Sequence, residues 1–254
     1  MIKVVVFGNG NMAWHLCNVF KNNQTVEVIQ HYHYQKRNSS FEGFKIPFIN
    51  DLHKLQKADF YLLAISDDVV KKFSSQLPLL EGIVMHTSGA LSIDQLHPKN
   101  RNGVFYPLQT LSKGKEVDFS QIPICIEASN ERDLQAIKEL ASAISQTYEE
   151  ITSEKRSALH LAAVYVNNFV NHLYQEAYQI CEEHQVNTSL LDSLIIETAQ
   201  KVIQTSPEEA QTGPAKRGDY QTIKKHLSML SQSQKKIYKT LSESLLKKYG
   251  REEL

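Results

Sequence analysis

The chain has 254 residues, which is enough for one or two domains with a sizeable buried core. Hydrophobic residues make up 41% of the chain and charged residues 22%, a balance typical of globular proteins and unlike that of disordered chains. The formal net charge is zero, so the composition gives no reason to expect a nucleic-acid or membrane partner. The three scattered cysteines lack metal-ligand spacing, and we expect packed thiols in a reducing, cytoplasmic compartment.

The first half of the chain alternates short apolar runs with helical stretches. Strands are expected at residues 3–7, 25–30, 58–65, 82–86, 103–106 and 122–127. Helices are expected at residues 11–21, in the stretch that follows residue 65, and at residues 131–146. Apolar strands separated by helices predict an α/β fold, with a doubly wound parallel sheet covered by helices on both faces.

The second half has a different pattern. Residues 154–184 are predicted to form one long helix, residues 189–205 and 231–249 two further helices, and residues 206–223 an irregular segment. No strand is expected after about residue 153. The sequence therefore predicts an N-terminal α/β domain over residues 1–150 and a C-terminal all-α domain over residues 151–254.

A glycine-rich turn lies between the first strand and the first helix. It consists of Gly8, Asn9, Gly10, Asn11, Met12 and Ala13. Gly8 permits the tight turn, Gly10 lets the backbone approach a pyrophosphate, and Ala13 allows close helix–sheet packing. The N-terminus of the helix would then hold the phosphates. Because strand, turn, helix and second strand follow in order within about 30 residues, this pattern predicts a Rossmann domain that binds a dinucleotide.

The end of the second strand indicates which dinucleotide is bound. An NAD enzyme usually has Asp or Glu there, and the only nearby acid, Glu27, lies too early in the strand. Lys36 and Arg37 would attract a 2′-phosphate and Ser39 could donate a hydrogen bond to it, so NADP(H) is favoured. Which of the three reaches the phosphate is open, and a solvated basic loop is the alternative interpretation. No metal site is expected, since the nearby HxH pair lacks a third ligand.

Ligands of such sheets bind beyond the carboxyl ends of the strands. The candidates there are Ile65 and Ser66 for the cofactor and His86, Thr87, Ser88 and Gln109 for the substrate. The polar members could hydrogen-bond a carbonyl or a carboxylate, but each could also be a turn or cap residue. Asp67 is expected to cap the helix that follows it.

A polar stripe on the long helix supplies a candidate proton donor. At 100° per residue, His160, Asn167 and Asn171 fall within about 20° of one line, whereas Asn168 lies about 80° away. Imidazole titrates near neutrality, so His160 could protonate a developing alkoxide. The alternative is a histidine with a structural role in a helix interface.

The segment from Thr212 to Asp219 contains a Gly-Pro turn followed by Lys216 and Arg217. Arg217 could bind an anionic substrate through two parallel hydrogen bonds. Alternatively, Asp219 pairs with Arg217 and holds the loop. Spacing alone leaves both interpretations open.

The motifs GNGNMA, HTSGALS, GVFYPLQT, HLAAVYVNNFVNHL and TGPAKRGDYQTIKKHL occur in this order. Together they resemble the Rossmann-like NADP oxidoreductases that carry the helical domain of unknown function 2520. The resemblance extends over nearly the whole chain, and the segment with TGP and RGD is its most specific part. The family is similar to the β-hydroxyacid dehydrogenase group and to ketopantoate reductases, and some members carry a deazaflavin-coenzyme label.

These relatives imply a homodimer built through the helical domain and an active site in the interdomain cleft. Related reductases use a helix Lys as proton donor, followed by Asn one and two turns later. On this helix His160 takes the Lys position, Val164 that of the first Asn and Asn168 that of the second. The sequence departs from the pattern at two positions, and Asn167 and Asn168 compete for the inward role.

The resulting hypothesis is hydride transfer from NADPH to the carbonyl or imine of a small carboxylated, ketopantoate-like metabolite. His160 would be the acid, Ser88 and Asn168 would orient the substrate, and Arg217 would hold its carboxylate. Two alternatives are a deazaflavin-dependent NADP reductase and a non-catalytic NADP-binding sensor or scaffold.

Overall fold

The computed structural model describes residues 1–21, 23–36, 38–252 and 254. The described residues form two compact units, residues 1–167 and residues 168–254. The division between the units lies further along the chain than residue 150, the end of the predicted first domain, because the beginning of the long helix is anchored on the sheet.

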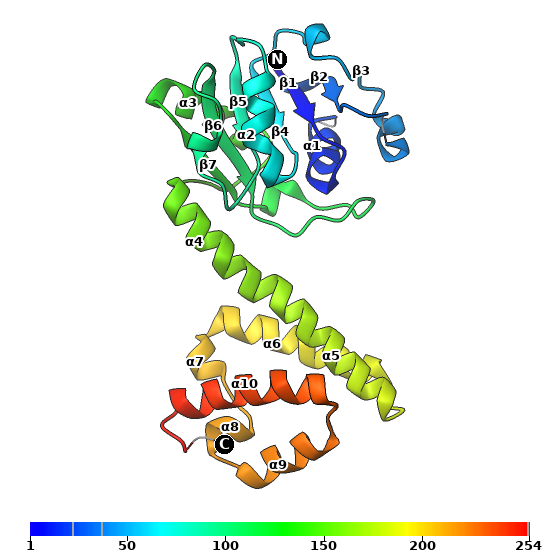
Figure 1. Ribbon diagram of the computed structural model, residues 1–254, viewed down its shortest axis with the longest axis vertical. Coiled ribbons are helices and arrows are strands. Elements are labelled where there is room, and N and C mark those ends of the chain that lie inside the picture. The colour runs from blue at the N-terminus through cyan, green and yellow to red at the C-terminus, as the bar shows by residue number, and fades with distance from the viewer. Residues whose placement is uncertain (22, 37, 253) are drawn as a thin grey trace. The chain divides into compact units, whose positions relative to one another are not determined.

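One eight-stranded sheet organises the first unit, in the order β3-β2-β1-β4-β5-β6-β7-β8 (Figure 1). The strands are β1 (Ile2–Phe7), β2 (Val26–Tyr32), β3 (Phe48–Ile49), β4 (Phe60–Leu63), β5 (Ile83–His86), β6 (Arg101–Pro107), β7 (Ile124–Ala128) and β8 (Tyr148–Glu150). The strand order reverses at β1, which pairs with β2 on one side and β4 on the other. A ligand crevice is expected at the carboxyl end of this switch point.

Helices cover both faces of the sheet, as the sequence predicts. They are α1 (Asn11–Lys21), α2 (Asp67–Gln76) and α3 (Glu131–Ser142). Val4 and Val6 pack in one buried cluster with side chains of α1 and α3. Val5 and Phe7 pack in a second cluster that includes Val70 of α2. Successive strand residues point to opposite faces, so the continuous apolar run of β1 serves both clusters.

One strand pair departs from the predicted parallel arrangement. β7 runs antiparallel to β6. A parallel return requires a crossover connection, usually a helix, whereas residues 108–123 contain only the short 3-10 turn Phe119–Gln121. β8 follows α3 and is parallel to β7. The two-residue β3 and the three-residue β8 were not predicted, because such short strands have too few residues to show a period.

Helix α4 (Ser153–Ala163) begins against the sheet through a buried ion pair. The guanidinium of Arg156 is fully buried, pairs with the carboxylate of Glu127 on β7, and donates to the carbonyl oxygen of Leu91. The same carboxylate accepts hydrogen bonds from the backbone and hydroxyl of Ser153 at 3.0 and 2.7 Å. These contacts fix the first turn of α4 to β7 and to the loop that follows β5.

The predicted single helix over residues 154–184 is interrupted by a π-helical segment. α4 is followed by π-helical residues Val164–Phe169 and then by α5 (Val170–Glu183). A π turn uses i→i+5 hydrogen bonds, so the 100° construction that aligned His160 with Asn167 and Asn171 does not hold across it. The π turn contains one extra residue, so the residue expected on the same helix face as His160 shifts by about one position, from Asn167 toward Asn168.

The second unit is helical, as the sequence predicts. After α5 it contains the 3-10 turn Thr188–Leu191, α6 (Asp192–Gln204), α7 (Pro207–Ala210), α8 (Pro214–Arg217), α9 (Tyr220–Met229) and α10 (Gln232–Lys248). Its buried core consists of Ala215, Ile223 and Leu246. The segment at 206–223, predicted to be irregular, contains two short helices and the start of α9. Their Pro and Gly residues lie at helix ends, where they end one helix and start the next.

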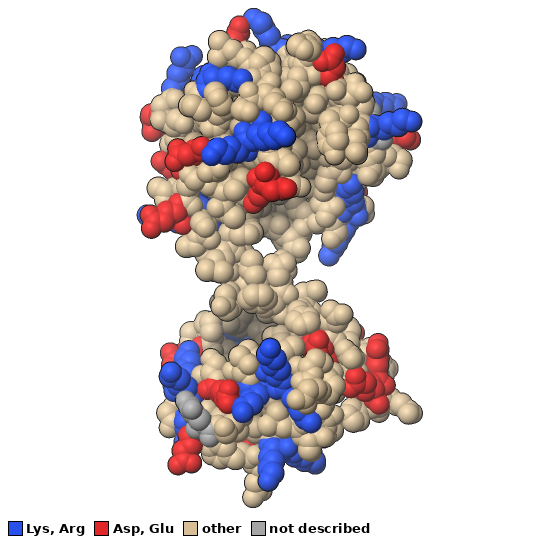
Figure 2. Space-filling view, in the orientation of Figure 1, with Lys and Arg blue, Asp and Glu red and all other residues tan. Residues whose placement is uncertain are grey.

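None of the helices in the described ranges is both long enough and apolar enough to cross a membrane. On the first unit, Figure 2 shows Lys and Arg side chains among Asp and Glu side chains on the visible face.

Candidate active site

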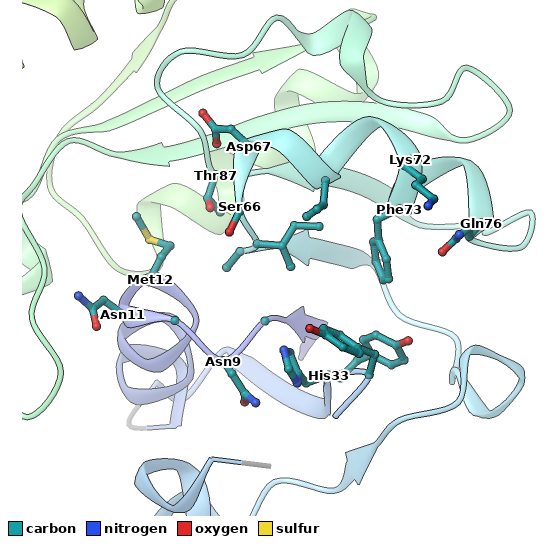
Figure 3. Close-up of a pocket in the computed structure, with 17 residues that line it drawn as sticks. Asn9, Asn11, Met12, His33, Ser66, Asp67, Lys72, Phe73, Gln76 and Thr87 are labelled. Carbon is teal, nitrogen blue, oxygen red and sulfur yellow. The ribbon is translucent and has the colours of Figure 1, made fainter. Parts of the chain in front are cut away.

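A groove of about 790 Å³ lies at the carboxyl end of the switch point (Figure 3). Its floor is the glycine-rich turn after β1, from Gly8 to Met12. One wall is formed by residues 64–67 after β4 and by Thr87 after β5. Of the predicted cofactor residues, Gly8, Asn9, Gly10, Asn11, Met12, Ile65 and Ser66 line this groove. Thr87, a predicted substrate residue, lines it as well.

Gly8 and Gly10 of the turn are required to be glycine for different physical reasons. Gly8 has φ 118°, and a Cβ there would lie 2.0 Å from the carbonyl oxygen of Ala64. Gly10 lines the groove and has open space where its Cβ would be. The first turn of α1 contains no acidic residue, so its positive end is available to an anion. The turn therefore fits a dinucleotide pyrophosphate. Ala13 is fully buried in the core between α1 and the sheet.

The groove continues along the end of β2, where the side chains of Tyr32, His33 and Tyr34 form a wall. The rings of His33 and Tyr34 lie 4.6 Å apart. Tyr32 and Tyr34 were not predicted as site residues, and His33 was considered only as half of the HxH pair, although the place of all three directly at the strand end was the available signal. His31, by contrast, is buried, and its Nε2 lies 2.6 Å from the Gly8 carbonyl oxygen.

The predicted 2′-phosphate ligands lie on the loop after β2. The Asn9 side chain donates to the carbonyl oxygen of Lys36 at 3.2 Å, while the Lys36 ammonium makes no hydrogen bond or ion pair with the described residues. Ser39 is exposed and begins the 3-10 helix Ser39–Phe44. Arg37 lies outside the described residues. Neither Lys36 nor Ser39 lines the groove itself.

The wall opposite β2 comes from α2, with Lys72, Phe73 and Gln76. Figure 3 shows these side chains across the groove from His33. Lys72 and Gln76 are four residues apart and so share one face of the helix. These three residues match no sequence motif, so they were not predicted.

Ser88 lies in the turn after β5, next to the groove residue Thr87. Its hydroxyl donates to Oδ2 of Asp67 at 2.8 Å and accepts from the backbone N–H groups of Ala90 and Leu91 at 3.1 Å. The hydroxyl thus uses its hydrogen-bonding capacity within the protein. The expected capping role of Asp67 is wrong: Ser66 is the N-cap of α2, and Asp67 is its first helical residue.

His86 and Gln109, the remaining candidates at strand ends, also lie outside the groove lining. His86 is fully buried, and its Nδ1 accepts from the backbone N–H of Ser88 at 3.2 Å. Burial and, secondarily, the charge of Arg156 lower the pKa of His86 to about 4. Gln109 is exposed, and its side-chain oxygen accepts from the backbone N–H of Thr110. His86 is therefore a buried residue that stabilises the loop after β5 through its bond to Ser88.

His160 meets the loop after β5 from α4. Its Nδ1 lies 3.1 Å from the hydroxyl oxygen of Tyr106, at the end of β6. A Cβ on Gly89 would lie 2.6 Å from this Nδ1 and 2.7 Å from Cζ of Tyr106. Burial raises the pKa of Tyr106, which keeps its hydroxyl protonated at neutral pH. Tyr106 was not predicted as a site residue, because nothing in the local sequence indicates its histidine partner.

The remaining predicted site residues are Asn167, Asn168 and Arg217. Asn167 is half-buried and Asn168 exposed, both in the π-helical segment. Arg217 is exposed at the end of α8 and forms no ion pair with the described residues. The alternative pairing of Asp219 with Arg217 is not what holds the loop. Asp219 instead caps α9, accepting from the backbone and hydroxyl of Thr222 at 3.1 and 2.7 Å.

The two glycines of the turn should fail differently when each is replaced by alanine. Gly8→Ala forces a positive φ and a collision with backbone, so it should cost at least about 2 kcal/mol of folding stability and abolish NADPH binding. Gly10→Ala should retain stability but weaken binding, because its methyl group occupies space needed by the pyrophosphate. Urea unfolding and a fluorescence titration with NADPH measure the two effects. Equal stability losses in both variants would contradict this account.

His86 should make the folded protein less stable in mild acid. In the unfolded chain its pKa is the usual 6.5, so between pH 6.5 and about 4 only the unfolded chain takes up the proton. The free energy of unfolding should therefore decrease as the pH is lowered through this window, by about 2 kcal/mol between pH 7 and pH 5. Urea unfolding of the protein and of His86→Asn measures the difference, since the variant should have a shallower pH dependence. An NMR titration that found His86 protonated at pH 5.5 in the folded protein would overturn the prediction.

Comparison with known proteins identifies relatives over the whole chain. A family model described as "Domain of unknown function (DUF2520)" matches residues 122–245. A structure from Bacteroides fragilis, whose assignment as an NADP oxidoreductase is provisional, is 32% identical with a TM-score of 0.87. That match covers 97% of this chain and 98% of the other. No curated protein sequence gives a significant match.

More distant structures share the fold. A protein from Thermotoga maritima is 21% identical with a TM-score of 0.72, and the match covers 97% of each chain. Pyrroline carboxylate reductase from Plasmodium falciparum, with NADP bound, is 12% identical with a TM-score of 0.62 and covers 98% of each chain. Because the Bacteroides fragilis match exceeds 30% identity over nearly the whole of both chains, this chain belongs to the family of Rossmann-like NADP oxidoreductases that carry the DUF2520 domain.

Proposed function

We propose that the protein reduces the carbonyl or imine group of a small carboxylated metabolite with NADPH. The observation that carries this proposal is that the loop after β5 contacts both the groove and the histidine. Thr87 lines the groove, and Gly89, two residues further along the chain, lies against His160 and Tyr106. A dinucleotide whose reactive end approached Thr87 would therefore place its substrate near an imidazole.

Different residues of the groove would bind different parts of the cofactor. The backbone at Gly10 and the N-terminus of α1 would hold the pyrophosphate, and Ile65, Ser66 and Thr87 would border the reactive end. NADPH, when bound, supplies the hydride. The apolar and backbone surfaces around it would limit water at the reacting carbon.

His160 would supply the proton. When the imidazole is protonated, its Nδ1–H donates to the Tyr106 oxygen and its Nε2–H is left for the substrate. As the hydride adds to the substrate carbon, the Nε2 proton passes to the carbonyl oxygen or imine nitrogen, and a neutral imidazole remains. Tyr106 thus orients the ring, and Gly89 leaves the space that both rings need. Solvent returns the proton after product leaves.

The substrate-binding roles remain predictions. Arg217 is the candidate ligand of the substrate carboxylate, and Asn168 the candidate for orienting the substrate. Ser88, whose hydroxyl is engaged with Asp67, would act by holding the loop that carries Gly89. Substitution of a carboxylate ligand should raise KM far more than it lowers kcat.

Removing His160 should separate chemistry from cofactor binding. His160→Gln is expected to lower kcat by about 100-fold or more while leaving the Kd for NADPH unchanged, since the imidazole is absent from the groove lining. Tyr106→Phe retains the ring and removes the hydroxyl, so it should lower kcat less and alter the pH profile of kcat. Stopped-flow oxidation of NADPH and a fluorescence titration measure the two quantities. Full activity of His160→Gln would remove this histidine from the mechanism.

The substrate for these assays is to be found by screening NADPH oxidation against 2-keto acids, ketopantoate included, and against cyclic imino acids. Turnover of one class identifies the group reduced. Reduction of a deazaflavin without turnover of either class would instead identify a deazaflavin-dependent NADP reductase. Tight NADPH binding with no oxidation in any assay would identify a sensor or scaffold.

The proposal includes a homodimer formed through the helical region. Leu161, Tyr165 and Val166 are 60, 63 and 75% exposed, and α6 exposes Ile196 and Ile203 at 57 and 83%. Ile196 and Ile203 are seven residues apart and share one helical face. A second copy covering the apolar side chains of either unit would remove them from water, which is a favourable contribution to association.

Light scattering after size exclusion tests the dimer. Unmodified protein should elute at twice the 29.0 kDa chain mass, and Ile203→Glu should shift the equilibrium toward the monomer. Lys201→Glu, which places the same charge at another exposed position of α6, is the matched control and should remain dimeric. A monomeric unmodified protein at micromolar concentration would contradict the proposal.

A further inference from the structure

A loop that follows β6 is fastened across the first turn of α1. The loop comprises residues 108–118, between β6 and the 3-10 turn that precedes β7. Nδ2 of Asn11 donates to the carbonyl oxygen of Leu111 at 2.8 Å. Nε2 of His15 lies 2.9 Å from the carbonyl oxygen of Ser112. The loop is thereby held beside the dinucleotide turn, although no motif connects the two segments.

The next residue of the loop, Lys113, brings a positive charge onto the turn. Its ammonium donates to the carbonyl oxygen of Asn9 at 2.6 Å and lies 5.6 Å from the centre of the Phe41 ring. An ammonium group has three N–H donors, so this bond leaves two for a ligand. Lys113 is half-buried, which restricts the directions in which those donors can point.

This charge is not balanced within the described part of the chain. No carboxylate there forms an ion pair with Lys113. The neighbouring first turn of α1 has no acidic residue, and a helix N-terminus carries a partial positive charge of its own. Holding an ammonium beside that terminus is unfavourable by itself and becomes favourable when an anion binds between them.

The contacts of Asn9 indicate which phosphate of NADP is the anion. Asn9 lies between Lys113, which bonds its carbonyl oxygen, and the loop after β2, where its side chain bonds Lys36. Phe41 belongs to the 3-10 helix that follows the same loop. In this fold the loop after the second strand lies by the 2′ position of the adenosine ribose, whereas the pyrophosphate lies over the amides at Gly10. Lys113 is therefore on the side of the 2′ group.

We infer that Lys113 binds the 2′-phosphate of NADP(H) and is a residue that selects NADP over NAD. The inference rests on the proposed function, because it requires that the groove holds the dinucleotide. Lys113 would act together with the loop after β2, from which the sequence predicts Lys36, Arg37 and Ser39 as ligands. Its contribution would be a charge-assisted hydrogen bond that NAD cannot form.

The test compares ligands that differ only in the 2′-phosphate. Lys113→Met removes the charge while retaining most of the apolar stem, and calorimetry measures its binding of NADPH, NADH, 2′,5′-ADP and 5′-ADP. We expect binding of NADPH and 2′,5′-ADP to weaken by about 10- to 100-fold, and binding of NADH and 5′-ADP to change less than about twofold. No turnover is needed for this measurement.

Lys115→Met is the matched control, since Lys115 lies on the same loop and is exposed. It should bind all four ligands like the unmodified protein. Lys72→Met removes a lysine that lines the groove and should not reproduce the selective loss. If Lys113→Met weakened NADPH and NADH equally, or neither, the inference would be wrong. Failure of the unmodified protein to bind NADPH at all would refute the proposed function as well.

Discussion

The buried ion pair between Arg156 and Glu127 is the constraint on which the candidate catalytic geometry depends. A fully buried guanidinium is costly unless its donors are satisfied, and here the two terminal nitrogens bond a carboxylate on β7, the Leu91 carbonyl and the hydroxyl of Ser153. Because His160 follows Arg156 by four residues, both project from one face of α4. Fixing the arginine to the sheet therefore also fixes the imidazole against Gly89 and Tyr106.

The groove depends on a second constraint, the close approach of β1 and β4 at the switch point. A side chain at Gly8 would collide with the backbone at Ala64, so the strands can pair at this distance only with glycine there. The same approach places residues 64–67 opposite the turn and forms two sides of the groove. Ser88 then links the loops after β4 and β5 through its bond to Asp67. One pattern of backbone packing thus positions the cofactor residues and the loop that meets His160.

Much of the first unit was predictable because its signals are local. The helix predicted for residues 11–21 has the observed bounds, since a glycine turn precedes it and an Asn-Asn pair follows it. The direction of β7 was not predictable from its apolar residues, since direction depends on what connects the strand to its partner. The π-helical segment was also missed, because it lies inside a long helical pattern and periodicity assumes one hydrogen-bonding pattern throughout. That assumption produced the faulty alignment of His160 with Asn167.

By itself, the sequence determined the doubly wound α/β fold, the dinucleotide turn, the helical second half and the NADP oxidoreductase family. These follow from periodicities and motifs that extend over a few residues to a few tens of residues. Only the tertiary structure decided the partners of the functional side chains. His160 meets a tyrosine 54 positions away, and Lys113 meets the glycine-rich turn across 104 positions. Such contacts depend on how strands and loops pack, which a local pattern does not encode. The dinucleotide turn could therefore be predicted from the sequence, whereas the side chains that contact it from distant parts of the chain depend on the fold.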